Sequence, residues 1–125
     1  MQTIEQLYES ILATAAELRA ANDELKALAR EHATAETYYR KIKATNYLQL
    51  AGTIPERNAQ VDLVANDAKE KAMLAEGLHQ AKLEEVRSIR SVLSALQTLT
   101  HTETADRELA GRHEDDKHFD TTAPF

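Results

Sequence analysis

Gly52-Thr53-Ile54-Pro55-Glu56 lies between two long stretches of helical pattern and is the strongest helix-breaking signal in the chain. Glycine suits the left-handed backbone position just after a helix ends. Thr53 and Glu56 have the spacing of a capping box, and Pro55 is tolerated in the first turn of a helix. One helix is therefore predicted to end and another to begin within a few residues. Because so short a connection favours antiparallel neighbours, the sequence predicts a long antiparallel helical hairpin.

Apolar residues before this break recur at steps of three and four, which is the spacing of an amphipathic helix. Four of them, Ile4, Ile11, Leu18 and Leu25, form a strict seven-residue series typical of a coiled-coil seam. The pattern predicts a first helix over residues 3–51, approximately.

The second helix is predicted from about residue 54 to about residue 110, and Gly77 is a candidate position for a bend in it. Its predicted apolar stripe consists of Val61, Val64, Ala68, Ala72, Ala75, Lys82 or Leu83, Val86, Ile89, Leu93, Leu96 and Thr100. Other apolar residues fall off this stripe, namely Leu63, Leu74, Leu78 and Leu99. Since two long helices cannot bury both sets, we expect a coiled-coil-like homo-oligomer.

Composition supports this all-α prediction. The chain has 125 residues, which suits one domain, with only three glycines, two prolines, and no cysteine or tryptophan. Without cysteine there is no disulfide or thiolate zinc site, which fits a reducing compartment. No apolar run approaches the ~20 residues that span a bilayer, and the first residues do not resemble a signal peptide. We therefore expect a cytoplasmic protein with no membrane contact.

Enzymatic chemistry is not expected from this sequence. It lacks a Gly-rich phosphate loop, a nucleophile elbow and a His-Glu-x-x-His zinc motif, so no catalytic residue and no cofactor are predicted. His113, Asp115, Asp116 and His118 could offer ligands to a divalent metal. A flexible tail is a poor metal scaffold, however, and no metal site is predicted.

Positive charge and tyrosine gather near the end of the first helix, and no acid occurs from Thr37 to Thr53. Phenol rings can stack on unpaired bases while cations meet phosphates, so this stretch is a candidate surface for single-stranded DNA. Its candidate contact residues are Tyr38, Tyr39, Arg40, Lys41, Lys43 and Tyr47. The alternative is that Tyr39, Ile42 and Tyr47 pack against the second helix. The net charge of −6 argues against a protein that coats nucleic acid by charge alone.

A second acid-free stretch, residues 86–102, combines apolar positions with small hydroxyl residues. Close helix packing between subunits is the simplest interpretation. Arg87 and Arg90 lie one turn apart and could extend a phosphate-binding strip.

The last thirteen residues, 113–125, are acidic, carry no helical pattern and end in Pro124-Phe125. We predict a disordered tail that a pocket on another protein could bind through the Phe125 ring. Residues 115–125 resemble the acidic Pro-Phe tip of bacterial single-stranded-DNA-binding proteins. The candidate partner-binding residues are Asp115, Asp116, Phe119, Asp120, Pro124 and Phe125. A merely solubilising tail is the alternative.

Residues 37–108 resemble UvsY-type phage recombination mediators. The resemblance lies in the tyrosine- and lysine-bearing end of the first helix, the short break, and the second helix with its Arg-Ser-Ile-Arg-Ser-Val-Leu-Ser-Ala-Leu stretch at 87–96. It implies a small, all-helical, oligomeric protein that loads a recombinase onto single-stranded DNA. The resemblance assigns no role to individual residues.

The leading hypothesis from the sequence is a non-enzymatic accessory protein of DNA recombination or replication. It would be phage-encoded, act in the bacterial host cytoplasm, bind single-stranded DNA, and recruit a protein with a pocket for the tip of the single-stranded-DNA-binding protein. Two alternatives remain open. One is a decoy that only occupies such pockets, and the other is a coiled-coil scaffold whose tail is inert.

Overall fold

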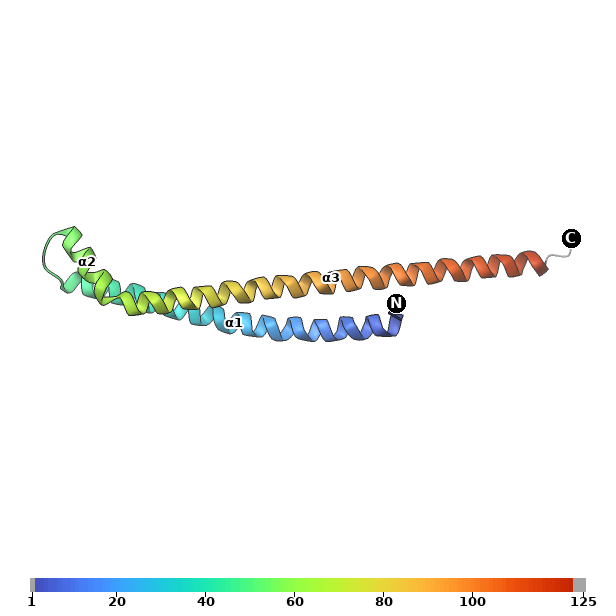
Figure 1. The fold of residues 1–125 in the computed structure, drawn as a ribbon, viewed down its shortest axis with the longest axis horizontal. Helices are drawn as coiled ribbons and strands as arrows, with labels where there is room; N and C mark the ends of the chain where they lie inside the picture. Colours follow the sequence, from blue (N-terminus) through green and yellow to red (C-terminus); the bar gives the residue numbers. More distant parts are fainter. Residues whose placement is uncertain (1, 123–125) are drawn as a thin grey trace. The chain divides into compact units, whose positions relative to one another are not determined.

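The computed structural model describes the backbone of residues 2–122 and the side chains of residues 2–111. Within this part of the chain the secondary structure consists of three helices and no strands (Figure 1). They are α1 (Ile4–Gln49), α2 (Ile54–Val64) and α3 (Asn66–Thr122). The all-α prediction is confirmed. Over the described residues, no helix carries a stretch long and apolar enough to cross a membrane.

Helix α1 begins and ends within two residues of its predicted bounds. Its start is fixed by a reciprocal pair of hydrogen bonds. The backbone N–H of Gln6 donates to Thr3 Oγ1 over 3.1 Å, and the N–H of Thr3 donates to Gln6 Oε1 over 2.9 Å. This capping box satisfies two backbone donors that a helix start leaves without intrahelical partners.

The break between α1 and α2 forms as the sequence predicts. Gly52 has a φ of 121°, a backbone conformation that favours glycine. The Thr53 side chain accepts a hydrogen bond from the Glu56 N–H at 3.4 Å, and the Glu56 carboxylate accepts one from the Thr53 N–H at 3.3 Å. The predicted capping box is therefore confirmed.

The prediction of a single second helix is wrong in one respect. Ala65, with φ −90° and ψ 4°, separates α2 from α3, whereas Gly77 lies inside α3 and causes no break. Asn66 and Asp67, which open α3, belong to the residue types that favour helix starts. The break is slight, because Ala65 still donates to the Val61 carbonyl at 2.8 Å and accepts from the Lys69 N–H at 2.9 Å.

Helix α3 extends to Thr122, past the predicted helix end near residue 110. The side chains of residues 112–122 and all of residues 123–125 lie outside the described residues. The prediction of a disordered tail is not confirmed, because the backbone of residues 113–122 is helical, while the predicted partner binding of its side chains stays a prediction.

The chain divides into two compact units, and each is described by itself. Unit 2, residues 19–87, contains the second half of α1, the turn, α2 and the first part of α3, with the helices side by side (Figure 1). Contacts between its two arms join Glu24 to Lys82 and stack His32 on His79. Near the turn, the Arg57 guanidinium lies over the Tyr47 ring. Residues further along α1 contact residues that come earlier in the returning arm of α2 and α3. Unit 2 is therefore an antiparallel helical hairpin.

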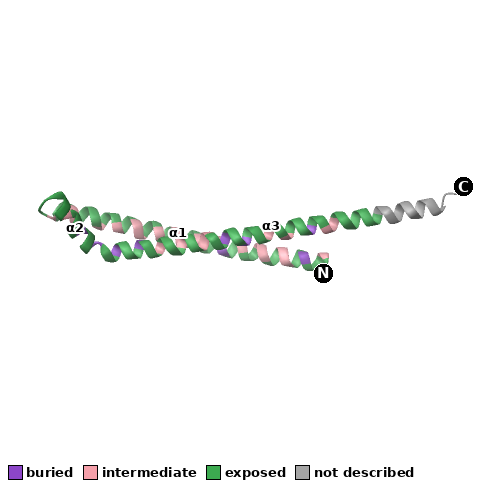
Figure 2. Cartoon of the chain, turned by 45° about the horizontal axis from the view of Figure 1, so that its top comes forward, coloured by how far each residue is buried: buried purple, intermediate pink, exposed green. Residues whose placement is uncertain are grey.

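The buried face of unit 2 follows steps of four and three residues along α2 and α3 (Figure 2). Its buried residues are Ala21, Val61, Ala65, Ala68, Ala72 and Val86. The sequence placed Val64 on this face, but Val64 is exposed and Ala65 takes its place, because the step from Val61 to the next seam position is four residues. Leu63, Leu74 and Leu78 are exposed, as their positions off the stripe predict.

Over the described residues, unit 1 combines the start of α1, up to Leu18, with α3 from Ser88 onward. Leu7, Ile89 and Thr100 are buried in it. The Thr100 hydroxyl donates to the Leu96 carbonyl at 2.8 Å, so this buried polar group is satisfied. Half-buried aliphatic residues complete the face, namely Ile4, Ile11, Leu18, Leu93 and Leu96.

Candidate nucleic-acid interface

The tip of unit 2 is built from the last turns of α1 and the first turns of α2. The capping box at Thr53 reverses the chain there, so that α2 returns beside the end of α1. An open groove of about 490 Å³ lies between the two helices. Its lining consists of Arg40, Lys43, Ala44, Tyr47 and Leu48 from α1 and Asn58 from α2. This volume falls within the ~300–1,000 Å³ typical of sites for small ligands.

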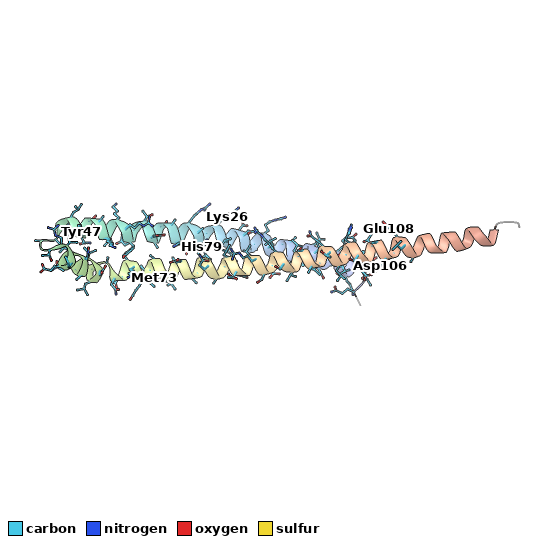
Figure 3. All side chains as sticks on the ribbon, turned by 90° about the horizontal axis from the view of Figure 1, so that it is seen from above. Lys26, Tyr47, Met73, His79, Asp106 and Glu108 are labelled. Carbon is cyan, nitrogen blue, oxygen red and sulfur yellow. The ribbon has the colours of Figure 1, made fainter. Side chains whose placement is uncertain are left out.

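Two tyrosine rings at the tip each lie beside a cation. Lys43 Nζ is 6.0 Å from the centroid of the Tyr39 ring, and the Arg57 Cζ atom is 5.8 Å from the centroid of the Tyr47 ring. Tyr47 lies at the turn end of the hairpin (Figure 3). Both rings are half-buried, and the Tyr47 ring contacts Arg57 of α2, as the alternative of packing against the second helix predicts for that residue. The same packing holds the rings in fixed places next to positive charge.

Arg57 is a residue of this site that the sequence prediction missed. Its guanidinium comes from α2, across the turn from Tyr47, and its Nε atom is buried with no hydrogen-bond partner within the described residues. The signal was present in the sequence, because a hairpin that turns at Gly52 returns position 57 toward position 47. Glu56, the capping acid directly before Arg57, ends the acid-free stretch, so Arg57 falls outside the stretch from which the candidate residues were taken.

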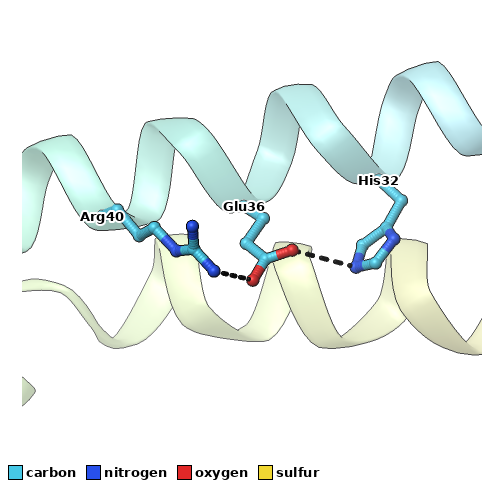
Figure 4. A network of polar contacts seen from close by, with 3 residues as sticks. All are labelled: His32, Glu36 and Arg40. Carbon is cyan, nitrogen blue, oxygen red and sulfur yellow. Dashed lines mark hydrogen bonds and ion pairs between the residues drawn. The ribbon is translucent and has the colours of Figure 1, made fainter.

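Arg40 is not free to bind an anion without competition (Figure 4). Its Nη2 atom donates to the Glu36 carboxylate over 2.7 Å. The same carboxylate lies 3.4 Å from His32 Nε2, one turn further back along α1. Glu36 thus holds Arg40 in an ion pair and ties it to the polar residues between the hairpin arms.

The remaining candidates from the basic stretch lie on another side of α1. Tyr38 and Lys41 are exposed and line a separate hollow of about 410 Å³ together with Ala33, Thr34 and Thr37. The division follows from helix geometry. Positions 40, 43 and 47 fall on one side at ~100° per residue, whereas positions 38 and 41 fall on another.

Arg87 and Arg90 do not line the tip groove. Arg87, in unit 2, pairs with Glu84 at 3.5 Å. Arg90, in unit 1, borders an open groove of about 710 Å³ with the small residues of the acid-free stretch, including Ser91, Ser94 and Ala95. These two arginines therefore belong to surfaces other than the tip.

Polar side chains also occupy the seam between the arms of unit 2. Lys82 Nζ donates to Glu24 at 2.5 Å and to Glu85 at 2.7 Å. These hydrogen bonds raise the pKa of Lys82 above its ordinary 10.5, and the bond to Glu24 makes the larger contribution. The rings of His32 and His79 stack with centroids 5.8 Å apart. His79 Nδ1 is buried and makes no hydrogen bond within the described residues. Where the side chains are described, no cluster of three His, Cys, Asp or Glu groups suits a metal ion.

The predicted partner-binding residues lie outside the described part of the chain. They are the side chains of Asp115, Asp116, Phe119, Asp120, Pro124 and Phe125. Their proposed role rests on the sequence alone.

Comparison with known proteins adds no family to this picture. No family model matches the sequence, and no curated protein and no solved structure matches it.

Proposed function

We propose that this chain is a non-enzymatic accessory protein of DNA recombination or replication that holds single-stranded DNA at the tip of unit 2. The observation that carries the proposal is the pair of tyrosine–cation contacts beside one groove. Stacking surfaces and positive charge are the two features that single-strand binding without strong sequence preference requires.

Electrostatics at the tip favours a phosphate backbone although the whole chain is acidic. From residue 36 to residue 58 the chain has four basic residues against two acids, giving a local charge of +2 compared with −6 overall. One acid, Glu56, is committed to the helix cap, and the other, Glu36, pairs with Arg40. Lys43 and Arg57 lie beside rings, and neither forms an ion pair within the described part of the chain. They are the cations that we expect to meet phosphates first.

Fluorescence anisotropy with a labelled single-stranded oligonucleotide over a salt series tests the proposal. Lys43→Glu should weaken binding and lower the slope of log K against log salt by about 0.7, the value for one single-strand phosphate contact. Tyr47→Leu should cost about 1–3 kcal/mol through lost stacking and leave the slope unchanged. Lys26→Glu, the same charge change at an exposed site along α1, is the matched control. Absence of binding by the wild type at low salt would refute the proposal.

We further propose that the protein works as a homo-oligomer. Large apolar side chains are exposed on each unit, among them Tyr8 and Leu12 in unit 1 and Leu63 and Leu74 in unit 2, and a second copy of the chain could cover them. Recruitment of a partner through the acidic tail belongs to the same proposal and rests on the sequence. A Phe125→Ala exchange should weaken binding to proteins that recognise the tip of the single-stranded-DNA-binding protein, measured with that tip as competitor. Unchanged binding would remove the tail from the proposal.

A helical scaffold without DNA contact is the second candidate function. It is favoured by the large apolar side chains that remain exposed on both units, including Leu12, Leu63 and Leu74. A scaffold would keep its assembly state and show no salt-dependent binding to oligonucleotides, so the same titration separates the two candidates.

A further inference from the structure

An exposed face with three leucines and two acids runs along α2 and the start of α3 in unit 2. Leu63, Leu74 and Leu78 are 81%, 65% and 49% exposed. With Asp67 and Glu70 between them, they follow steps of four, three, four and four residues, which keeps them on one side of the helix. The seam continues at the same steps across Ala65, so the break does not rotate Leu63 away from this face. We call these five residues the leucine face.

The centre of the leucine face has the form of a hole for an incoming side chain. A hollow of about 310 Å³ is lined by Asp67, Glu70, Lys71 and Leu74. These positions, at i, i+3, i+4 and i+7, are the four residues that surround an inserted side chain in knobs-into-holes packing. Leu74 thus borders a hole on this face and is itself exposed.

The charges on this face select the direction of a second copy. A parallel partner would place Asp67 against Asp67 and Glu70 against Glu70, which is repulsive. In an antiparallel pair with Leu63 of one chain opposite Leu78 of the other, Glu70 of each chain lies opposite Lys71 of its partner. The two-fold symmetry thus creates two such pairs of opposite charge. In the same register Leu74 lies opposite Asp67, at the edge of the hollow, and Glu70 and Lys71 of the two chains meet over its centre.

We propose that the leucine face is the self-association surface of this protein, on which a second copy packs antiparallel with Leu63 of each chain beside Leu78 of the other. The inference rests on the self-association part of the proposed function and is independent of the DNA part. It assigns the oligomer contact to α2 and α3 of unit 2, not to the acid-free stretch of residues 86–102 that the sequence favoured.

Sedimentation equilibrium of the full chain at micromolar concentration tests the surface. Leu74→Glu should raise the dimer dissociation constant by on the order of thirtyfold, the size expected for loss of an interface hot spot. Met73→Glu is the matched control, since Met73 is the adjacent residue, is 61% exposed, and lies about 100° away around α3 (Figure 3). A monomeric wild type would overturn both this inference and the proposed homo-oligomer. A wild-type dimer that Leu74→Glu does not weaken would overturn the inference alone.

Cross-linking tests the register and does not depend on how well Leu74→Glu folds. The chain has no cysteine, so single cysteines report unambiguously. When chains carrying Leu63→Cys are mixed with chains carrying Leu78→Cys and oxidised, the mixed 63–78 disulfide should dominate over either symmetric disulfide. Dominant symmetric disulfides would contradict the antiparallel register, and absence of any disulfide would contradict contact at these positions.

Discussion

The two units of this chain pack their helices with different kinds of side chain. In unit 1 the inner face is aliphatic, with Leu7 and Ile89 buried and several half-buried leucines and isoleucines beside them. In unit 2 it consists largely of buried alanines, and the positions between them hold His32, His79 and Lys82.

The difference separates two contributions to folding. Large aliphatic side chains supply free energy in proportion to the apolar area that they bury. Alanines bury little area but let helices approach closely. A polar pair raises the free energy of any helix register in which one of its two members is buried without the other. Unit 1 should therefore provide more stability for each contact, and unit 2 should provide the alignment that sets the tip groove.

Leu7→Ala tests the aliphatic side of this comparison and should have the largest effect. Leu7 is almost fully buried, so truncation should cost about 2–4 kcal/mol of unfolding free energy through lost burial and the cavity left behind. Hydrogen exchange should show the loss concentrated in residues 2–18. Leu12→Ala, at an exposed site one turn beyond, should change stability by less than about 0.5 kcal/mol. Equal effects of the two exchanges would mean that unit 1 has no aliphatic core.

Two glycine exchanges test unit 2 with opposite signs. Gly52→Ala should destabilise the chain by about 1–2 kcal/mol, because φ is 121° and a Cβ would meet Glu56 Oε2 at 2.6 Å, displacing the capping carboxylate. Gly77→Ala should stabilise it by about 0.5–1 kcal/mol, since a Cβ there meets nothing within 4 Å. Urea unfolding measures both. Destabilisation by Gly77→Ala would show that α3 needs flexibility at that position.

The sequence predicts most of this fold, and its failures have local causes. The turn was predictable because its signals are local. Gly52 acts through its own backbone conformation, and Thr53 and Glu56 act on each other across three residues. The choice between Val64 and Ala65 depends on how α2 packs against α1, and both residues are apolar. That choice cannot be made from spacing alone.

The candidate site was predictable in composition but not in geometry. The acid-free stretch located Lys43 and Tyr47, while the ion pair of Arg40 involves Glu36, four residues upstream and just outside the stretch. The groove also needs Asn58 from α2, and the contact on the Tyr47 ring needs Arg57; only the turn brings these two residues near α1. Residues separated by a turn are found by folding the hairpin, not by scanning one helix.

Alkaline pH tests the polar seam of unit 2. Hydrogen bonds to Glu24 and Glu85 raise the pKa of Lys82, so the folded state holds this proton more tightly than the unfolded state. The resulting stabilisation is fully present below the ordinary pKa of 10.5 and is lost as pH rises through the raised value. The wild type should therefore lose more stability than Lys82→Met between about pH 10 and pH 12, measured by urea unfolding. Equal losses would remove Lys82 from the account of the seam.

Glu36→Gln sharpens the comparison where the polar seam meets the tip, and its effect should be the smallest. Glu36 links His32 of the seam to Arg40 of the groove. Its carboxylate forms an ion pair with the guanidinium of Arg40 and so competes with a phosphate for that guanidinium. The pair is exposed, with 74% of the Arg40 and 40% of the Glu36 side chain accessible, so it is worth only about 0.2–1 kcal/mol. The amide keeps the size of the side chain and removes its charge. Single-strand affinity should then rise by no more than about fivefold, and the salt slope should steepen by up to about 0.7 as Arg40 gains a phosphate.

Glu31→Gln removes the same charge from an exposed site on α1 and should leave the slope unchanged. If both exchanges raise affinity equally, net charge is the cause. If Glu36→Gln lowers affinity, the ion pair orients Arg40 for DNA, and the seam of unit 2 supports the tip instead of competing with it.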